Sequence, residues 1–225
     1  MRTAFMKPDR MAMDAILVEL FTEPRCPGLV EIAWTDTESP FRLRNAKQFD
    51  CTNVHAAVVF AAHQNSEPGR NIYFGPGLRR PDIDPGRRAG DKEVIAASSV
   101  WTDHDDEVGF RTAIERATQI GIAPTLAVQT GSFPSLRGHL WWKLDSFCHD
   151  LQVHRTIERA MAQVLGGDPS VVNPSRLMRL PGSIAWPTKP GRRVELTKVY
   201  SGSSRSGAYY KIKDFDAVVA MSRQE

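Results

Sequence analysis

The sequence has few cysteines and no long apolar run, and these absences exclude several classes of protein. Its three cysteines, Cys26, Cys51 and Cys148, are odd in number, lie far apart and form no Cys-x-x-Cys pair. Neither a zinc knuckle nor a disulfide framework is therefore expected. No apolar run approaches the roughly 20 residues that span a membrane, and the first residues lack the apolar core of a signal peptide. We expect a soluble cytoplasmic protein with no membrane partner.

Acidic residues are almost absent from one long segment, although the net charge of the chain is only +3. Residues 176–213 contain nine Lys or Arg and a single acid, Glu195. A second basic cluster lies in segment 76–92, which is dense in Pro and Gly and is predicted to be a loop. Such clusters favour a polyanionic partner; the alternative is a solvated surface. The candidates for binding single-stranded DNA are Arg79, Arg80, Arg87, Arg88, Lys189, Arg192 and Arg193.

Hydrophobic patterns predict an α/β (α+β) chain in the order αβαβ and then βαββαβ. The 225 residues, 41% of them hydrophobic, suffice for one large domain or two interlocked modules. The second half matches the split βαβ pattern of ferredoxin-like or RNA-recognition-motif-like sheets. We predict an N-terminal αβ unit at 1–94, an RNA-recognition-motif-like core at 95–200 and a tail or capping helix at 201–225. The predicted helices are 14–21, 53–63, 107–120, 151–165 and 214–221, and the predicted strands 30–35, 71–74, 95–102, 125–129, 139–144 and 193–200.

Two carboxylates at the end of a predicted buried strand are candidate metal ligands. Asp103 and Asp105 are two residues apart, so both point to one face of a strand and His104 points away. Such a pair can bind a hard cation such as Mg²⁺. The alternative is that one of them caps the following helix, although Asp106 is better placed for that role. Asp168, in Gly-Gly-Asp-Pro, is a further candidate ligand or simply a turn residue.

A loop with hydroxyl, glycine and basic residues joins the next two predicted strands. Close backbone approach at its glycines, together with the side chains of Ser132, Ser135, Arg137 and His139, can cradle a triphosphate. In this interpretation Arg137 and His139 are cationic donors. The alternative for His139 is a core histidine beside Trp141, with one ring of the Trp141-Trp142 pair buried and one at the surface.

Arg176 and Arg179 are three residues apart, so a helical turn would direct both side chains the same way. Guanidinium groups there could neutralise phosphate charge in a transition state. The alternative is an ion pair of each arginine with a neighbouring carboxylate.

Three blocks of the sequence resemble the signature motifs of the RepB-like primase domain, which belongs to the archaeo-eukaryotic primase superfamily. They are Val100-Trp-Thr-Asp-x-Asp-Asp, Gly131-Ser…Gly-His-Leu-Trp-Trp-Lys-Leu144 and Gly166-Gly-Asp-Pro…Asn-Pro-Ser-Arg-Leu-Met-Arg-Leu-Pro-Gly-Ser183. The segment Asn71-Ile-Tyr-Phe-Gly-Pro-Gly…Arg79 also resembles the strand that precedes the first motif. The resemblance covers residues 50–190 and is most specific in the third block.

The resemblance implies a DNA primase with an RNA-recognition-motif-like catalytic core and a packed N-terminal unit. It implies synthesis of short primers from nucleoside triphosphates on a single-stranded DNA template, in plasmid, phage or mobile-element replication. The implied roles are two Mg²⁺ or Mn²⁺ ions on Asp103, Asp105 and Asp168, phosphate contacts from His139, and basic motif positions at Arg176 and Arg179.

Two departures from the family pattern stand out. The second motif is often Ser-x-His, whereas Arg137 stands here where Ser would be, with Ser135 or Ser132 as substitutes. The sequence also lacks a helicase motif of the form Gly-x-x-x-x-Gly-Lys-Ser/Thr. The resemblance therefore implies that a replicative helicase or initiator protein comes from elsewhere.

Three other functions fit parts of the sequence. A rolling-circle relaxase needs a pair of metal-binding histidines and a nucleophilic tyrosine, and here Tyr209 and Tyr210 are available but His139-Leu-Trp lacks the second histidine. A non-catalytic module that binds single-stranded nucleic acid would not need the carboxylates. A metal-dependent nuclease could use the carboxylates without the nucleotide loop.

Overall fold

The computed structural model describes residues 6–21, 26, 28–38, 42–200 and 209–224. Its α-helices are α1 (Arg10–Phe21), α2 (Val54–Asn65), α3 (Glu107–Gln119), α4 (Leu151–Leu165) and α5 (Asp216–Met221). Short 3₁₀ helices are η1 (Cys51–Asn53), η2 (Asp91–Glu93), η3 (Pro169–Val171) and η4 (Ile212–Phe215). The strands are β1 (Leu29–Thr35), β2 (Leu43–Asp50), β3 (Ile72–Phe74), β4 (Gly77–Arg79), β5 (Val94–His104), β6 (Leu126–Gly131), β7 (Arg137–Cys148), β8 (Met178–Arg179), β9 (Ile184–Ala185), β10 (Glu195–Leu196) and β11 (Lys198–Val199).

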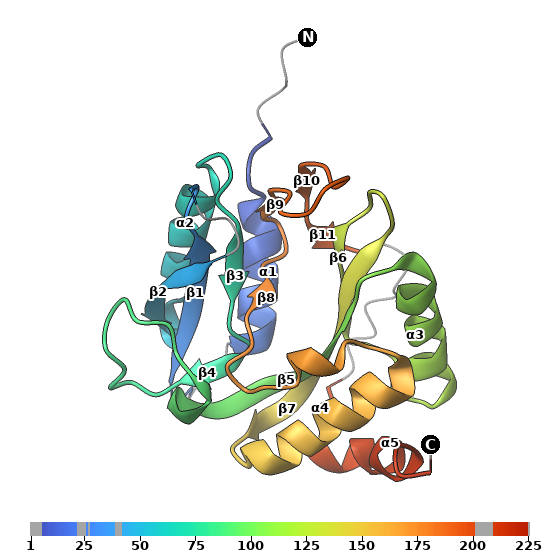
Figure 1. The fold of residues 1–225 in the computed structure, drawn as a ribbon. Coiled ribbons are helices and arrows are strands. Elements are labelled where there is room, and N and C mark those ends of the chain that lie inside the picture. Colours follow the sequence, from blue (N-terminus) through green and yellow to red (C-terminus); the bar gives the residue numbers. More distant parts are fainter. Residues whose placement is uncertain (1–5, 22–25, 27, 39–41, 201–208, 225) are drawn as a thin grey trace.

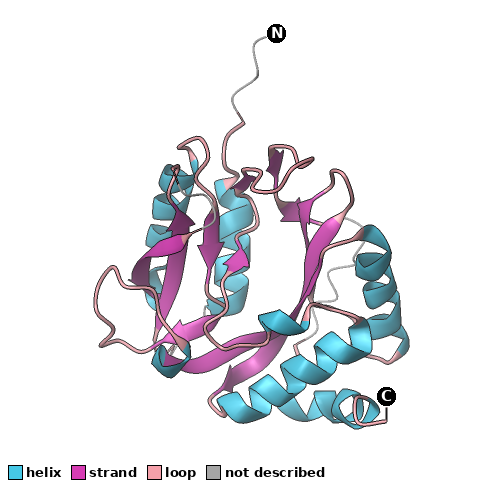
Figure 2. Ribbon diagram, in the orientation of Figure 1, coloured by secondary structure: helices cyan, strands magenta, loops and turns pink. Residues whose placement is uncertain are grey.

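One antiparallel sheet joins both halves of the chain. Among the described residues its order is β11-β6-β7-β5-β4-β1-β3-β8, with β2 on the other side of β1, and β9 and β10 form a separate pair. The β1–β3 half stands opposite the β6–β7 half, and β4 and β5 connect them at the base (Figure 1). Helices α1 and α2 cover one half and α3, α4 and α5 the other, as the colouring of Figure 2 makes clear. The α+β class predicted from the sequence is confirmed.

Alternation along β5 and β7 sends side chains to two different cores. Trp101 and Trp141 pack in one cluster with residues of α1 and α2, whereas Val100 and Trp142 pack in the other with residues of α3 and α4. This follows from the two-residue period of a strand. Both rings of the Trp141-Trp142 pair are fully buried, so the expectation of one surface ring is wrong.

Local signals located most helices and strands correctly. The carboxylate of Asp106 accepts a hydrogen bond from Gly109 N at 2.8 Å and caps α3, and α4 ends at Gly166 with a left-handed φ of 68°. These two ends were predicted from residue type alone.

Strand pairing shows where the sequence-based prediction was incomplete. The segment taken as a loop at 76–92 contains β4, which pairs with both β1 and β5, and β2 was not foreseen. The predicted strand 193–200 is divided into β10, which pairs with β9, and β11, which pairs with β6. Strand β8 pairs with β3 across the predicted boundary at residue 94.

A disulfide joins two of the three cysteines. Cys26 and Cys51 are bonded, with their Cα atoms 6.2 Å apart and a sequence separation of 25, while Cys148 is free and buried. The expectation of no disulfide is wrong because the fold brings together cysteines whose spacing gave no sign of pairing. None of the helices in the described part of the chain combines the length and apolar character needed to span a membrane.

Candidate active site

One pocket collects most of the residues that the sequence singled out. Asp103 on β5 lies opposite His139 on β7 in the strand register, and the same face carries Asp105. The lining is Tyr73, Asp103, Asp105, Thr130, Arg137, His139, Arg176, Leu177, Met178, Arg179, Ala185, Trp186, Pro187, Thr188, Arg192 and Arg193, around about 680 Å³ of space that includes its open mouth. Two carboxylates thus face five guanidinium groups, an arrangement suited to a metal-bound polyphosphate.

The two lining carboxylates differ in exposure and in electrostatics. Burial, reinforced by the neighbouring charge of Asp105, raises the pKa of Asp103 to about 6, although Arg176 opposes the shift. The Asp103 side chain is 23% exposed, whereas that of Asp105 is 71% exposed. Two nearby carboxylates resist ionising together unless a cation neutralises them. The pair therefore has the electrostatics of a cation site, and the prediction that both side chains share one face is confirmed.

His139 is a neutral group in this pocket. Burial, with the charges of Arg179 and Arg176, lowers the pKa of His139 to about 3. Its Nε2 lies 3.5 Å from Asp103 Oδ1, and its buried Nδ1 has no hydrogen-bond partner among the described residues. The expectation of a cationic His139 is wrong because nearby guanidinium groups and burial both disfavour its protonated form. A neutral imidazole can still donate one hydrogen bond to a phosphate.

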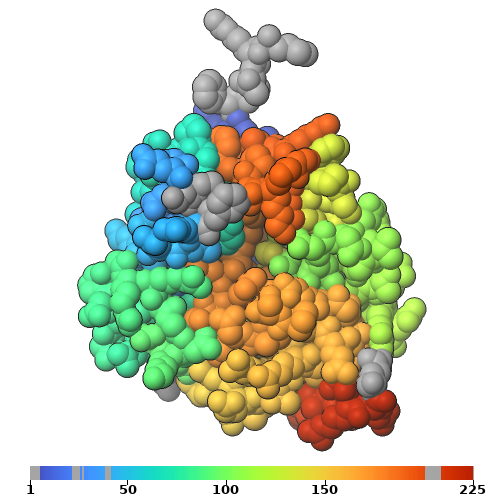
Figure 3. Space-filling model, in the orientation of Figure 1, coloured from blue at the N-terminus to red at the C-terminus, as the bar shows by residue number. Residues whose placement is uncertain are grey.

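A basic segment after β9 closes over the exposed carboxylate. Lys189 Nζ lies 3.8 Å and Arg192 Nη2 lies 3.3 Å from the oxygens of Asp105. Arg193 stacks on the ring of Phe133, with 3.7 Å between its Cζ and the ring centroid. In the space-filling view this orange segment crosses the middle of the face, between the N-terminal half and the green β5–α3 region (Figure 3). The structure thus places these three candidates for DNA binding at or beside the pocket.

Helix α4 and the turn after it hold the edge of β5 that β4 leaves uncovered. His154 Nε2 lies 2.9 Å from Ser99 O, and Trp101 N donates to Glu158 Oε1 at 2.9 Å. Asp168 N then donates to Asp103 O at 2.9 Å. These bonds occur at every second residue of β5, as a neighbouring strand would make them. They fix the backbone that carries Asp103.

The structure does not bring the Asp168 side chain into the pocket. Its carboxylate accepts hydrogen bonds from Ser170 N at 2.8 Å and Ser170 Oγ at 2.9 Å, and so caps η3. The described residues contain no group of three or more His, Cys, Asp or Glu side chains placed to hold a metal ion. The turn role considered for Asp168 is confirmed, and its role as a third metal ligand stays a prediction.

The loop between β6 and β7 is organised by Arg137 and Glu195. Arg137 Nη1 donates to Phe133 O at 2.9 Å and to Ser135 O at 3.0 Å, and its Nη2 lies 3.8 Å from Glu195 Oε1. Glu195 accepts hydrogen bonds from the backbone N of Ser132, at 2.7 Å, and from its hydroxyl.

The two serines predicted to bind nucleotide do not line the pocket. The hydroxyl of Ser135 accepts a hydrogen bond from Glu107 N at 3.1 Å, and that of Ser132 is bonded to Glu195. Both hydroxyls therefore serve the loop and its neighbours, whereas Arg137 faces the pocket. The expected substitution of a serine for the missing Ser of the second motif is not seen in this structure.

Arg176 and Arg179 both line the pocket, but not as members of a helix. Arg179 is the second residue of β8, and its guanidinium donates to Asn71 Oδ1 at 2.5 Å and to Tyr73 Oη at 3.0 Å. It also stacks on the Tyr73 ring, with 4.9 Å from Cζ to the centroid. Both side chains face the pocket, as a helical turn would also have placed them, although the segment is not helical and Met178–Arg179 pairs as a strand with β3.

No protein-family model and no curated protein matches this chain at the level of sequence. Solved structures do match its fold. One is the archaeo-eukaryotic primase (AEP) domain of the cyanophage S-2L primase-polymerase, with a TM-score of 0.62, 20% identity, and coverage of 95% of this chain and 100% of that one. Another is primase RepB′, with a TM-score of 0.62 and 18% identity over 96% of this chain and 62% of that one. The RepB′ catalytic domain in complex with initiator DNA matches at a TM-score of 0.60 and 18% identity, over 96% and 93%.

The chain has the fold of an archaeo-eukaryotic primase domain. The resemblance inferred from three short motifs is thereby confirmed at the level of the fold. The pocket that contains Asp103, Asp105 and His139 is built from the strands that carry the first two of those motifs.

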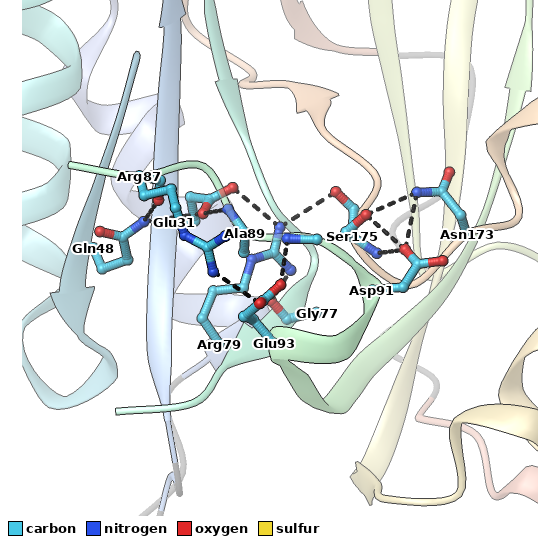
Figure 4. Close-up of polar contacts among 11 residues, drawn as sticks. Glu31, Gln48, Gly77, Arg79, Arg87, Ala89, Asp91, Glu93, Asn173 and Ser175 are labelled. Atoms are coloured by element: carbon cyan, nitrogen blue, oxygen red, sulfur yellow. Dashed lines mark hydrogen bonds and ion pairs between the residues drawn. The ribbon is translucent and has the colours of Figure 1, made fainter. Parts of the chain in front are cut away.

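Arg79 is not a DNA-binding residue in this primase fold. It is fully buried, donates to Gly77 O at 2.7 Å and lies 3.4 Å from Glu31 Oε1. Its Nη2 also contacts Ser175 O at 3.5 Å, directly before Arg176 of the pocket. Figure 4 shows this network linking β1, β4 and the segment around Ser175. Arg79 therefore fastens the third-motif segment to the N-terminal half.

The other arginines of the 76–92 segment lie at the surface. Arg80 pairs with Asp82 at 3.0 Å, and Arg87 pairs with Glu93 at 2.8 Å and with Asp84 at 3.8 Å. Asp82 and Asp84 thus pair with arginines of the same segment. Arg88 is exposed. None of these three arginines lines the pocket, and their contact with DNA stays a prediction.

Several residues that shape the pocket were not selected from the sequence. Glu195 orders the β6–β7 loop, Glu158 and His154 hold β5, and Asn71 and Tyr73 orient Arg179. Only Glu195 carried a signal in the sequence that could have selected it, because it is the single acid in the basic segment 176–213. The others act through contacts between segments distant in sequence, which carry no local pattern.

Proposed function

We propose that the chain is a DNA primase of the primase-polymerase type, a nucleotidyltransferase that makes short primers on a single-stranded DNA template. The observation that carries the proposal is the meeting of Asp103 and Asp105 with five arginines in one pocket. The likeness to primase folds supports it, including that to the RepB′ catalytic domain, which was solved with initiator DNA.

The donor set fits a hard divalent cation. Mg²⁺ binds proteins through one or two carboxylates and completes its shell with water and substrate phosphates, so Asp103 and Asp105 suffice to hold Mg²⁺ or Mn²⁺ with a nucleotide. Burial, and after it the neighbouring charge of Asp105, raises the pKa of Asp103, and a cation bound between the two carboxylates would offset both effects. A bound cation would supply charge neutralisation to the triphosphate and to the attacking hydroxyl.

The residues of this chain supply positioning and charge. Arg137 and Arg179 are anchored by the loop and strand contacts described above, and Arg176 lines the same pocket. The guanidinium groups of all three suit phosphate oxygens. His139, neutral and buried, offers a hydrogen bond without a competing charge. Apolar walls from Leu177, Met178 and Pro187 leave room for the sugar and base. Phosphoryl transfer needs little covalent work from the protein, so this pre-arranged charge is the main contribution.

The decisive experiment compares two Asp-x-Asp pairs. The wild type is incubated with single-stranded DNA, labelled nucleoside triphosphates and Mg²⁺ or Mn²⁺, beside D103N/D105N and the surface control D82N/D84N. We expect oligomers from the wild type and the control, and a loss of at least about 100-fold in D103N/D105N, since acidic ligands cannot be replaced by amides at a metal site. Equal activity of D103N/D105N and wild type would overturn the proposal.

The same assay separates the alternatives. Single-strand binding without synthesis by any variant supports the non-catalytic module, and metal-dependent cleavage of the template supports a nuclease. A relaxase is disfavoured because neither of its candidate nucleophiles, Tyr209 and Tyr210, lines the pocket. The Tyr210 hydroxyl instead donates a hydrogen bond to Ala123 O at 2.5 Å.

The variant D168N tests the third ligand. Asparagine caps a helix about as well as aspartate, so D168N preserves η3 while removing the charge. We expect strong loss of activity at unchanged stability if Asp168 reaches the metal with substrate bound. Full activity would assign Asp168 a structural role alone.

A further inference from the structure

A second concave surface lies directly behind the pocket wall that carries the third motif. It is lined by residues of α4 and of segment 166–173, and α4 lies at the front of the molecule in Figure 1. Its lining is Arg155, Arg159, Ala162, Gln163, Gly166, Gly167, Pro169, Ser170, Val172 and Asn173. The open space is about 1290 Å³, larger than that of the active-site pocket, and no acidic side chain belongs to the lining. We refer to it as the α4 groove.

Two arginines give the α4 groove its charge. Arg155 and Arg159 lie one helical turn apart on α4, so their side chains are neighbours on its outer face. In the described part of the chain, no ion pair within 4.0 Å joins either one to a carboxylate. At longer range Arg155 interacts with Asp91: hydrogen bonds from Ser175 and Asn173, together with the charge of Arg155, lower the pKa of Asp91 in spite of its partial burial. The Nε of Arg155 is buried and has no hydrogen-bond partner there. In this they differ from Arg80 and Arg87, whose charges are already paired.

The groove and the active-site pocket share a wall. Asp168, between groove residues Gly167 and Pro169, donates its backbone N to Asp103 O at 2.9 Å. Asn173 of the groove donates to Ser175 Oγ at 3.0 Å, and the next residue, Arg176, lines the pocket. A polymer bound in the α4 groove would therefore contact residues adjacent in sequence to Asp168, whose backbone is hydrogen-bonded to that of Asp103.

We propose that the α4 groove binds the sugar-phosphate backbone of the single-stranded DNA template. This inference rests on the proposed function, and it adds a template contact on α4 to the basic residues predicted from the sequence. A positively charged groove can track the backbone of a single strand, and guanidinium groups bind phosphate oxygens in pairs of hydrogen bonds. The lining of the α4 groove has no aromatic side chain on which bases could stack, so the proposed contact is with the backbone alone. Gln163, Ser170 and Asn173 add neutral polar groups that can contact phosphate or sugar.

The test uses a charge-removing pair and a matched control. R155Q/R159Q removes both groove charges, whereas R42Q/R44Q removes two exposed arginine charges at and beside β2. Binding of a fluorescent oligonucleotide of mixed sequence is measured by anisotropy at several salt concentrations, with the metal omitted. Urea unfolding of each variant shows whether the fold is retained.

We expect R155Q/R159Q to raise the Kd for single-stranded DNA at least about tenfold at low salt. The slope of log Kd against log salt should fall by roughly 1.4, because each single-strand phosphate contact contributes about 0.7. R42Q/R44Q should match the wild type. In primer synthesis, the KM for template should rise while the KM for nucleotide stays unchanged.

Three results would overturn the groove proposal. They are no binding of single-stranded DNA by the wild type, unchanged affinity and slope in R155Q/R159Q, and an equal loss in R42Q/R44Q, which would show diffuse attraction to net charge. Failure of the proposed function gives a different pattern: the wild type makes no primer, yet R155Q/R159Q still loses binding. That pattern would retain the groove as a nucleic-acid site and reject the primase.

Discussion

Removing the buried charge of Arg79 should destabilise the protein strongly. Both Arg79 and Glu31 are fully buried, and Glu31 Oε2 keeps its donors from Gln48, at 3.0 Å, and Ala89, at 2.8 Å. In R79M the other oxygen, Oε1, loses its guanidinium partner. Breaking a buried pair in this way costs about 3–5 kcal/mol because one charge is left uncompensated. For a chain of this size, that corresponds to a fall in Tm of about 6–20 °C.

Urea unfolding followed by circular dichroism measures the loss, and two variants control for its cause. R80Q removes the neighbouring arginine, whose pair with Asp82 is exposed and should contribute less than about 1 kcal/mol. R79M/E31Q removes the stranded charge as well and should recover part of the stability lost in R79M. A loss in R79M no larger than that in R80Q, or no recovery in the double variant, would refute the argument from uncompensated charge.

Two further predictions concern the pocket and the edge of β5. A Cβ at Gly131 would lie 1.9 Å from Arg137 Nη2. The substitution G131A should therefore displace this guanidinium and raise the KM for nucleotide by roughly tenfold. Unchanged kinetics would argue against a phosphate role for Arg137. Burial lowers the pKa of His154 to about 4. Between about pH 4 and 6.5 the unfolded chain therefore binds a proton at His154 that the folded chain does not bind. Because of this difference, the free energy of unfolding rises with pH by up to about 1.4 kcal/mol per pH unit. H154Q should remove this contribution and flatten the dependence of stability on pH in that window, which urea titrations from pH 4 to 7 would detect; an unaltered pH profile would show that His154 is not held neutral.

Local patterns were sufficient for the elements that carry the chemistry. Two-residue alternation predicted that Asp103, on β5, and Asp105, directly after it, face the same way, and both line the pocket. The position of Asp106 identified the start of α3. The helical spacing over residues 151–165 gave the bounds of α4. Each of these signals lies within one turn or strand, where backbone geometry alone decides the direction of a side chain.

Pairings between segments distant in sequence could not be predicted from local sequence patterns. Arg79 and Arg80 are adjacent and of the same residue type, yet Arg79 is buried against Glu31 and Arg80 is exposed. The difference arises because β4 fits between β1 and β5, a pairing with no local signature in a segment rich in Pro and Gly. For the same reason the disulfide of Cys26 with Cys51 was not foreseen.

The sequence by itself determined the α+β class, the strand-end carboxylates and the likeness to primase motifs, because periodicity and short motifs express local geometry. Only the tertiary structure decided which polar groups face the pocket. In the structure the Ser132 hydroxyl is bonded to Glu195, and the Asp168 carboxylate caps the 3₁₀ helix η3. It also left Arg155 and Arg159 beside an open groove. These outcomes depend on which carboxylates and carbonyls the fold brings within hydrogen-bonding distance, and residues far apart in sequence settle that together.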